Sequence, residues 1–260
     1  MPIVTLTSDM GHDNHYAAVV KGILLSLRPG LTLVDVTHTV ANYDLLQAAF
    51  IVQHAAPAFP AETIHLIAVD PDLSDGGQGV VMRYRDQWFV GPNNGILTLI
   101  SNGEVREAID IQREDLLIRS YPPSFRAARV FAPAAAFLAG GGAAAELGPQ
   151  VALRDLRWGE PVSNGHSLRG KIIHIDKFGN AITNIRRDGF LHMKQGRRFE
   201  IIIRNVRLRR IVNAYSDVAR ADALALFGES NNLEIAMREA SAAELLGLKV
   251  HDMITIEFLV

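Results

Sequence analysis

The 260-residue chain contains no cysteine. Disulfide bonds, thiolate metal sites and a cysteine nucleophile are therefore excluded. An excess of one charge is also lacking, because 26 Lys and Arg residues nearly balance 28 Asp and Glu residues and leave a formal net charge of -2. This balance favours neither a nucleic-acid partner nor an anionic membrane. No apolar run approaches the ~20 residues of a transmembrane helix, and the first residues lack the pattern of a signal peptide. We therefore expect a cytoplasmic protein without a membrane partner.

Signatures of several enzyme classes are missing as well. The chain has neither the glycine-lysine phosphate loop nor a Gly-x-Ser-x-Gly elbow, which disfavours nucleotide triphosphatases and serine hydrolases. Histidines and acidic residues suggest a metal hydrolase only weakly, because a metal site needs several converging ligands and supporting hydrogen bonds. We expect no metal site. The histidines and acidic residues that give this weak suggestion of a metal hydrolase are His12, His15, His38, His54, His65, Asp9 and Asp13.

The residues that are present predict a globular protein whose first part alternates strands and helices. Hydrophobic residues make up 48% of the chain and charged residues 21%, and the length suits one large domain or two modest ones. The alternation predicts right-handed crossovers and a largely parallel sheet. A hairpin from Val80 and a small-residue helix at 131–138 follow. The alternating elements are a strand from Ile3, a helix at 16–27, a strand at 31–36, a helix through His54 and a strand at 64–69.

The second part of the chain is predicted to consist almost entirely of short strands. A polar, glycine-containing stretch between Trp158 and Gly170 suggests the boundary, with domains at 1–160 and 168–260. The predicted fold class is α/β, with an N-terminal α/β domain containing a largely parallel sheet and a C-terminal small β-barrel. A sandwich is the alternative for the second domain. Its predicted strands are 171–175, 181–185, 199–204, 206–212, 223–227, 233–237 and 253–259, with a helix at 241–246.

Two predicted strands end in carboxylates. Asp9 follows the first strand and is succeeded by Gly11, and Asp70 follows the strand at 64–69. Ligands of open α/β sheets bind beyond the carboxyl ends of the strands, so both side chains are expected at one rim. The alternative is that each Asp simply caps the turn or helix that follows it.

Two polar turns are further candidates. The turn at 176–180 gathers a carboxylate, an aromatic ring and an amide, which suit an ammonium group, a stacked base and a base edge. The simpler reading is a hairpin whose Asp176 and Asn180 bond their own backbone. The loop at 92–95, Pro-Asn-Asn-Gly, reads as a plain turn because asparagine and glycine tolerate positive φ.

Eight short motifs resemble, in order and spacing, those of the S-adenosylmethionine hydroxide adenosyltransferases, which are relatives of the fluorinases and chlorinases. The resemblance covers nearly the whole chain, and the eight motifs together are specific although each alone is weak. The motifs are TSDMG at 7–11, KG at 21–22, VDVTH at 34–38, AVDP at 68–71, PNNGILT at 92–98, FAPAAA at 131–136, DKFGNAITNI at 176–185 and LEIAM at 233–237.

This resemblance implies cleavage of S-adenosylmethionine at the ribose 5′-carbon. In the hydroxide branch, water attacks and the products are adenosine and L-methionine, without a metal or cofactor. The implied partner is a small adenosyl substrate, with no nucleic acid. The implied assembly is a homotrimer whose sites lie between the N-terminal domain of one subunit and the C-terminal domain of its neighbour.

The resemblance also implies roles for individual residues. Asp70 would belong to the Asp-Arg-His set that activates water. The implied ligand contacts are Asp9 with the ribose hydroxyls, Tyr43 beside the ribose, Phe125 in the nucleophile pocket, Asp176 with the methionine ammonium, Phe178 and Asn180 with adenine, and Ser230 with the methionine carboxylate.

The chain departs from the family pattern at the implied site. Gly77 stands where the family has the arginine of the set, Arg126 where it has the histidine, and Asp72 where a glycine is usual. We predict that Arg126 or Arg129 replaces the missing partners of Asp70 by opposite charge.

A further departure is Glu229 at a serine position, although Ser230 follows and a one-residue slip would restore the serine. A carboxylate at this position would repel the methionine carboxylate. Two alternatives therefore remain open: a catalytically impaired protein that binds or senses an adenosyl ligand, and an enzyme of the same fold acting on another adenosine derivative. Halide use is disfavoured, although Ala127 would leave space.

Overall fold

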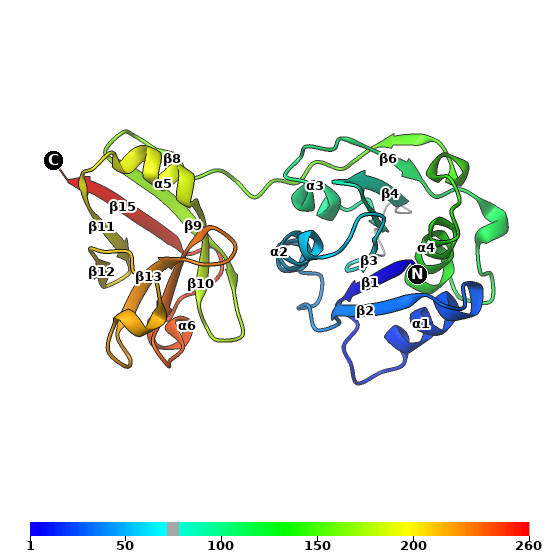
Figure 1. Cartoon of the computed structure of the whole chain (residues 1–260), viewed down its shortest axis with the longest axis horizontal. Coiled ribbons are helices and arrows are strands. Elements are labelled where there is room, and N and C mark those ends of the chain that lie inside the picture. The colour runs from blue at the N-terminus through cyan, green and yellow to red at the C-terminus, as the bar shows by residue number, and fades with distance from the viewer. Residues whose placement is uncertain (72–77, 260) are drawn as a thin grey trace. The chain divides into compact units, whose positions relative to one another are not determined.

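The computed structural model describes residues 1–71 and 78–259. The chain is a mixed α/β protein with two sheets, and it divides into the compact units Met1–Arg157 and Trp158–Val260 (Figure 1). In the described part, no helix combines the length and the apolar character needed to cross a membrane.

The first unit is built on a seven-stranded sheet with the order β2-β1-β3-β5-β4-β6-β7. Its first half, from β2 to β5, is parallel, and its second half, from β5 to β7, is antiparallel. The expectation of a largely parallel sheet is therefore correct only for the first half. Hairpin pairing of β4 with β5 reverses the strand direction and starts the antiparallel half. The strands are β1(Ile3–Ser8), β2(Thr32–Thr37), β3(Ile64–Ala68), β4(Gly79–Tyr84), β5(Gln87–Pro92), β6(Glu107–Asp110) and β7(Gln150–Ala152).

Helices cover both faces of this sheet. Figure 1 shows α1 and α4 on one face and α2 and α3 on the other, and each pair is in contact. The helices are α1(Tyr16–Leu27), α2(Leu45–Ala55), α3(Ile96–Ile100) and α4(Ala132–Ala139). Short turns are η1(Ala56–Ala58), η2(Glu114–Leu116), η4(Ala144–Leu147) and the π-helical η3(Ala127–Phe131), which runs directly into α4.

The α1 and α4 sequences account for their close packing. In α1, the buried residues Ala17, Val20, Ile23 and Leu24 recur at helical spacing and form one apolar stripe. In α4, four of the eight positions are buried alanines, Ala132, Ala134, Ala135 and Ala136, so its backbone can approach its neighbours closely. Both helices contribute to one core with Val4 and other inward-facing residues of the sheet.

The second unit is an antiparallel sheet that curves into an almost closed barrel. Its order is β12-β11-β15-β9-β10-β14-β13, with β8 paired to β9, and the edge strands β12 and β13 are in contact. The predicted strand at 206–212 is shorter than expected and ends at Leu208. The strands are β8(Val162–Ser163), β9(Ser167–Ile175), β10(Ala181–Arg186), β11(Arg198–Ile203), β12(Val206–Leu208), β13(Ala223–Phe227), β14(Asn232–Met237) and β15(Met253–Leu259).

A helix that the sequence pattern does not predict lies against this barrel. In α5(Arg187–Lys194), the buried residue is Phe190, whose ring lies 5.1 Å from that of Phe199 and 5.5 Å from that of Phe227. Phe190 and Met193 pack into the barrel core at helical spacing, but the helix has only eight residues, which is too short for this spacing to be recognised as a periodic pattern in the sequence. The other helical segments here are α6(Ala242–Leu245), whose start is capped by the Ser241 side chain, and η5(Tyr215–Asp217).

His65 of β3 is a buried histidine within the first unit. Its Nδ1 lies 2.7 Å from Thr5 Oγ1, and its ring stacks on Phe89 at 4.8 Å between centroids. The residue is 2% exposed, and burial lowers the pKa of His65 from the ordinary 6.5 to about 4. The folded protein therefore holds this ring in its neutral form at neutral pH.

We expect His65 to make the stability of the first unit depend on pH. Because the folded-state pKa lies below the unfolded value, its contribution is present above about pH 6.5 and is lost as the pH falls toward about 4. The free energy of unfolding should fall by about 2 kcal/mol from this source between about pH 7.5 and about pH 5. Urea unfolding of the wild type and of His65→Gln, which cannot titrate, measures this. The same pH slope in both proteins would contradict the assignment.

Candidate functional site

The ends of β1 and β3 form one rim of the first sheet. The strands are parallel neighbours, and Ser8 of β1 pairs with Ala68 of β3. Asp9 follows Ser8 directly, and Asp70 follows Ala68 by two residues. The strand register therefore brings both carboxylate-bearing residues to the same edge, as their positions at the strand ends predict.

Asp9 contacts a distant loop. Its Oδ2 accepts a hydrogen bond from the backbone N–H of Tyr43 at 3.0 Å. Within the described residues, the start of α1 at His15 has no side-chain cap, so Asp9 does not serve as one. Tyr43 has a φ of 65° and a 70% exposed side chain. A positive φ is unusual for an aromatic residue and costs free energy, so this loop conformation depends on bonds such as the one to Asp9.

Asp70 also has a left-handed backbone, with a φ of 45°. The side chain of Asn94, which is 4% exposed, donates through Nδ2 to the carbonyl oxygens of Val69 and Asp70, both at 3.1 Å. Asn94 Oδ1 accepts from the backbone N–H of Ile96 at 3.2 Å. One buried amide thus holds the backbone that presents Asp70.

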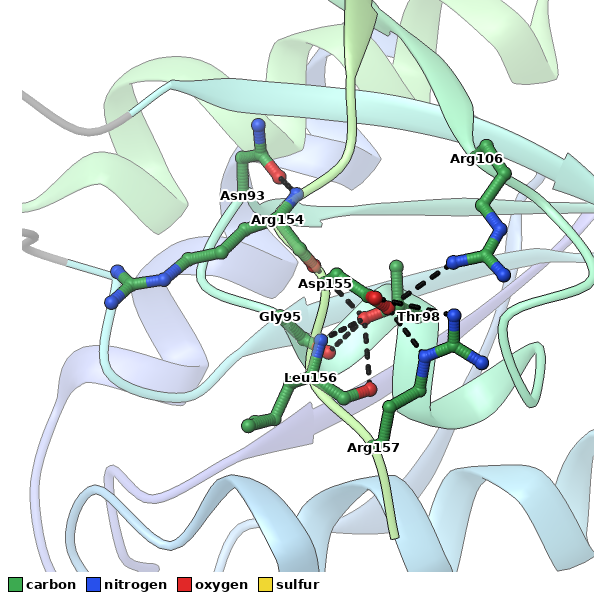
Figure 2. A network of polar contacts seen from close by, with 8 residues as sticks. All are labelled: Asn93, Gly95, Thr98, Arg106, Arg154, Asp155, Leu156 and Arg157. Atoms are coloured by element: carbon green, nitrogen blue, oxygen red, sulfur yellow. Dashed lines mark hydrogen bonds and ion pairs between the residues drawn. The ribbon is translucent and has the colours of Figure 1, made fainter. Parts of the chain in front are cut away.

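The loop that carries Asn94 is itself fixed to the last segment of the first unit (Figure 2). Asn93 Oδ1 accepts from the Arg154 N–H at 2.8 Å, and Thr98 Oγ1 accepts from the Leu156 N–H at 3.0 Å. Gly95 has a φ of +101°, and a Cβ there would lie 2.7 Å from the Leu156 Cβ. The Pro-Asn-Asn-Gly loop is therefore a hydrogen-bonded junction as well as a turn.

Phe125 and Arg126 directly precede the π-helical turn η3, and Arg129 lies within it. Phe125 is half-buried, with its ring 5.3 Å from that of Tyr16. The Arg126 guanidinium lies 5.9 Å from the ring centroid of Phe131. Arg129 donates through Nη1 to the Tyr121 carbonyl at 2.8 Å. Single π-helical turns are common at functional sites because they shift the helical register locally.

Two of the departures from the family pattern, Asp72 and Gly77, lie outside the described residues. The other two departures, Arg126 and Glu229, are described residues.

In the second unit, the turn at 176–180 is held by its own carboxylate. Asp176 Oδ1 accepts from the N–H groups of Phe178 and Asn180, both at 2.9 Å, and Oδ2 accepts from Asn180 Nδ2 at 2.9 Å. The self-bonded hairpin expected from the sequence is confirmed. Asn180 is buried, but the Phe178 side chain is 77% exposed.

The loop between β13 and β14 carries the other predicted contact. Ser230 Oγ accepts from the Asn232 N–H at 3.3 Å, and Glu229 is exposed. Nearby, the buried Glu234 accepts from the Tyr215 hydroxyl at 2.6 Å. Burial is the largest cause that raises the pKa of Glu234, and the negative charge of Asp176 adds to it. The hydrogen bond from Tyr215 acts in the opposite direction but does not outweigh them.

The histidines of the first unit make separate contacts. Among residues 1–71 and 78–259, no group of three or more His, Asp or Glu side chains could hold a metal ion. His54 Nδ1 bonds the Phe50 carbonyl on the same helix at 2.7 Å, and His65 is buried beside Thr5. His38 lies at 2.7 Å from Ser8 Oγ, close to the rim.

Comparisons with known proteins match both units to one family. Residues 4–148 match the SAM hydroxide adenosyltransferase N-terminal domain, and residues 170–255 match the C-terminal domain of the same name. The chain belongs to the SAM hydroxide adenosyltransferase family. The motifs quoted from the sequence therefore indicate the correct family.

Individual members of the family align over most of the chain. The "(R)-S-adenosyl-L-methionine hydrolase" of Thermus thermophilus is 33% identical, covering 95% of this chain and 96% of that protein. A "Fluorinase" of an Actinoplanes species is 28% identical, covering 72% of each chain. The crystal structure of an uncharacterized conserved protein from Thermotoga maritima superposes with a TM-score of 0.87 at 29% identity, covering 98% of this chain and 99% of that one.

Sequence reasoning missed two residues that support the rim. The sequence pattern predicts only a plain turn at Asn94, although a pair of asparagines before glycine in an apolar context also suits a buried amide. The sequence alone indicates His38 only as one of several histidines that are weak metal-ligand candidates, although it is the last residue of the family motif at 34–38. In both cases the informative contact joins residues about 25 to 30 positions apart, and local pattern does not reveal such contacts.

We expect Asn94→Ala to destabilise the first unit. The change leaves the buried carbonyl of Val69 and that of Asp70 without the Asn94 amide, which should lower the free energy of unfolding by roughly 1–3 kcal/mol. Urea unfolding measures the loss. Asn205→Ala, in an exposed turn, is the matched control and should stay within about 0.5 kcal/mol of wild type. Equal stability of the two variants would show that the Asn94 bonds contribute little.

Proposed function

We propose that this protein hydrolyses S-adenosyl-L-methionine to adenosine and L-methionine. The observation that carries the proposal is its 33% identity, over 95% of the chain, to a protein named (R)-S-adenosyl-L-methionine hydrolase. The placement of Asp9 and Asp70 at one rim supports the proposal, because a carboxylate pair at that edge can bind hydroxyl groups and orient a water molecule.

The proposed reaction is a displacement at the ribose 5′-carbon. The water oxygen forms a bond to C5′, the bond from C5′ to sulfur breaks with its electron pair on sulfur, and one water proton is released. Methionine leaves as a neutral thioether because the sulfonium already carries the positive charge. No acid, metal or cofactor is needed for that departure, so the enzyme has mainly to position and partly desolvate the water.

The first unit is proposed to supply the ribose and water contacts. Asp9, already fixed through one oxygen to the Tyr43 N–H, would accept from the ribose hydroxyls, with the Tyr43 ring beside the sugar. Asp70 would orient the water, Arg126 would be its positively charged partner, and Phe125 would line the pocket. The left-handed backbone at Tyr43 and Asp70 supports this assignment, because such strain concentrates at functional sites.

The second unit is proposed to supply the contacts to the rest of the ligand. Asp176 would pair with the methionine ammonium, Phe178 and Asn180 would contact adenine, and Ser230 the methionine carboxylate. The hydrogen bonds to Asp176 from its own turn support this role, because they fix the carboxylate before any ligand arrives.

Product analysis tests the proposed reaction. The purified chain is incubated with S-adenosyl-L-methionine, and adenosine and methionine are quantified by chromatography. We expect equimolar products from wild type and about 10²-fold less from Asp70→Asn, which cannot orient water as a carboxylate does.

The same assay tests the role of Arg126. Arg126→Ala should reduce turnover much more than it weakens substrate binding. Unchanged turnover in either variant would remove that residue from the proposed mechanism.

A second candidate function is a protein that binds an adenosyl ligand and turns it over slowly or not at all. Glu229 favours it, because an exposed carboxylate beside Ser230 would repel the carboxylate of methionine. Binding of S-adenosyl-L-methionine without products in the same assay would support this candidate. An absence of binding would point to another adenosine derivative as the substrate.

We also propose that the protein assembles as a homotrimer. The support is the exposure of two large side chains at predicted ligand positions, 70% for Tyr43 and 77% for Phe178, which a neighbouring subunit could cover. Multi-angle light scattering should give the mass of three 28.5 kDa chains. A monomeric mass at micromolar concentration would contradict the assembly. A cytoplasmic location and the lack of nucleic-acid and membrane partners stay predictions from the sequence.

A further inference from the structure

His38 lies in a continuous chain of polar contacts behind the β1 rim. Its Nδ1 is 2.7 Å from Ser8 Oγ, and its Nε2 is 3.1 Å from Asp35 Oδ1. The other oxygen of Asp35, Oδ2, accepts from Lys21 Nζ at 2.6 Å. His38 is 2% exposed. The chain therefore runs from a half-exposed lysine to a buried serine that directly precedes Asp9.

The chemistry of the partners fixes the proton positions in this chain. A carboxylate only accepts hydrogen bonds, so Nε2 of His38 carries the proton and donates it to Asp35. Burial lowers the pKa of His38, in opposition to Asp35, and favours the neutral ring. Nδ1 then has a free lone pair and accepts from the Ser8 hydroxyl. Burial opposes the charged form of Asp35, but the hydrogen bonds from Lys21 and His38 outweigh it and lower the pKa of Asp35.

The backbone around His38 holds the segment of Asp9 from both sides. The N–H of Gly11 donates to the His38 carbonyl at 2.7 Å, and the N–H of Val40 donates to the Ser8 carbonyl at 3.4 Å. A register shift between Leu6 and Thr7 precedes these contacts in the pairing of β1 with β2. Asp9 thus lies between Ser8 and Gly11, whose backbone groups are hydrogen-bonded to Val40 and His38 respectively.

A Ser-His-Asp set invites comparison with a nucleophile and its general base. Ser8, however, is 3% exposed, and its Oγ also accepts from the Met10 N–H at 3.4 Å. A nucleophile must reach its substrate, so this burial assigns the set to holding the backbone and not to covalent chemistry.

We propose that His38 is the positioning residue for Asp9, and that through Ser8 and Gly11 it aims the Asp9 carboxylate at a ligand with an intact ribose 2′,3′-diol. This inference rests on the role of Asp9 in the proposed function. It goes beyond that function by making recognition of the diol depend on a residue that does not touch the ligand.

Two histidine replacements separate the contacts. The Asn side chain can place its oxygen near the position of Nδ1 and retain the Ser8 bond, whereas the Gln side chain reaches the position of Nε2 and retains the Asp35 bond. Calorimetric titration with adenosine and with 2′-deoxyadenosine gives the ratio of the two affinities for each protein. We expect wild type to favour adenosine by about 10-fold or more. His38→Gln should lose most of this ratio, and His38→Asn should retain most of it.

Further variants keep the test decisive. Ser8→Ala removes the same bond with a smaller change of volume and should also lower the ratio, which covers the case in which a His38 variant does not fold. His54→Gln, on the α2 helix, is the control and should bind both nucleosides as wild type does.

The possible results distinguish this inference from the proposed function. An unchanged ratio in folded His38→Gln and in Ser8→Ala would overturn the inference alone. Equal binding of both nucleosides by wild type would overturn it together with the ribose role of Asp9. A ratio that falls as expected in a protein that yields no adenosine from S-adenosyl-L-methionine would support the inference and reject only the hydrolysis.

Discussion

Parallel pairing of β1 between β2 and β3 is the constraint on which the candidate site depends. The register aligns Ser8 with Ala68, so the chain leaves both strands at the same level and Asp9 and Asp70 emerge side by side in the order of the strands. On the other side of β1, Thr7 pairs with Thr37 of β2. The next residue of the chain, His38, therefore lies beside Ser8 and contacts its hydroxyl. A slip of one residue would turn every side chain of β1 to the opposite face and would break the 2.7 Å contact of Thr5 Oγ1 with His65 Nδ1, so this buried contact favours the register that the site needs.

The rim combines strained backbone with buried hydrogen bonds that compensate for the strain. Tyr43 and Asp70 both have positive φ angles. Each strained segment is tied to a polar group of another segment, Asp9 in the first case and Asn94 in the second. The hydrogen bonds of Asp9 and Asn94 thus offset the cost of the strained backbone. The same hydrogen bonds orient the groups that are proposed to contact the ligand. A local turn sequence alone could not sustain these conformations.

How much of this could be predicted from sequence depends on whether the signal is local. The helix at 16–27 has the bounds expected, because an apolar stripe and the Arg-Pro-Gly stop act within a few residues. In the antiparallel half of the first sheet, the sequence predicts the hairpin of β4 and β5 but not the pairing of β6 and β7, because strand order and direction beyond a hairpin are set by contacts between distant segments. The α5 helix spans only eight residues, too few for the apolar spacing of Phe190 and Met193 to be recognised as a periodic pattern. The positions of Asp9 and Asp70 at strand ends were predictable, whereas the supporting contacts of Asn94 and His38 were not.

The turn at 176–180 shows why a structural and a functional reading of the same residues need not compete. Asp176 satisfies three donors of its own turn, which is the simpler expectation from the sequence. The same bonds restrict the carboxylate to one orientation, so a ligand cation would meet it without a further loss of conformational entropy. Asp9 follows the same logic, since its bond to Tyr43 fixes one oxygen. In both units the polar residue that stabilises the loop is therefore also the residue best prepared to bind, and a substitution there would change fold and recognition together.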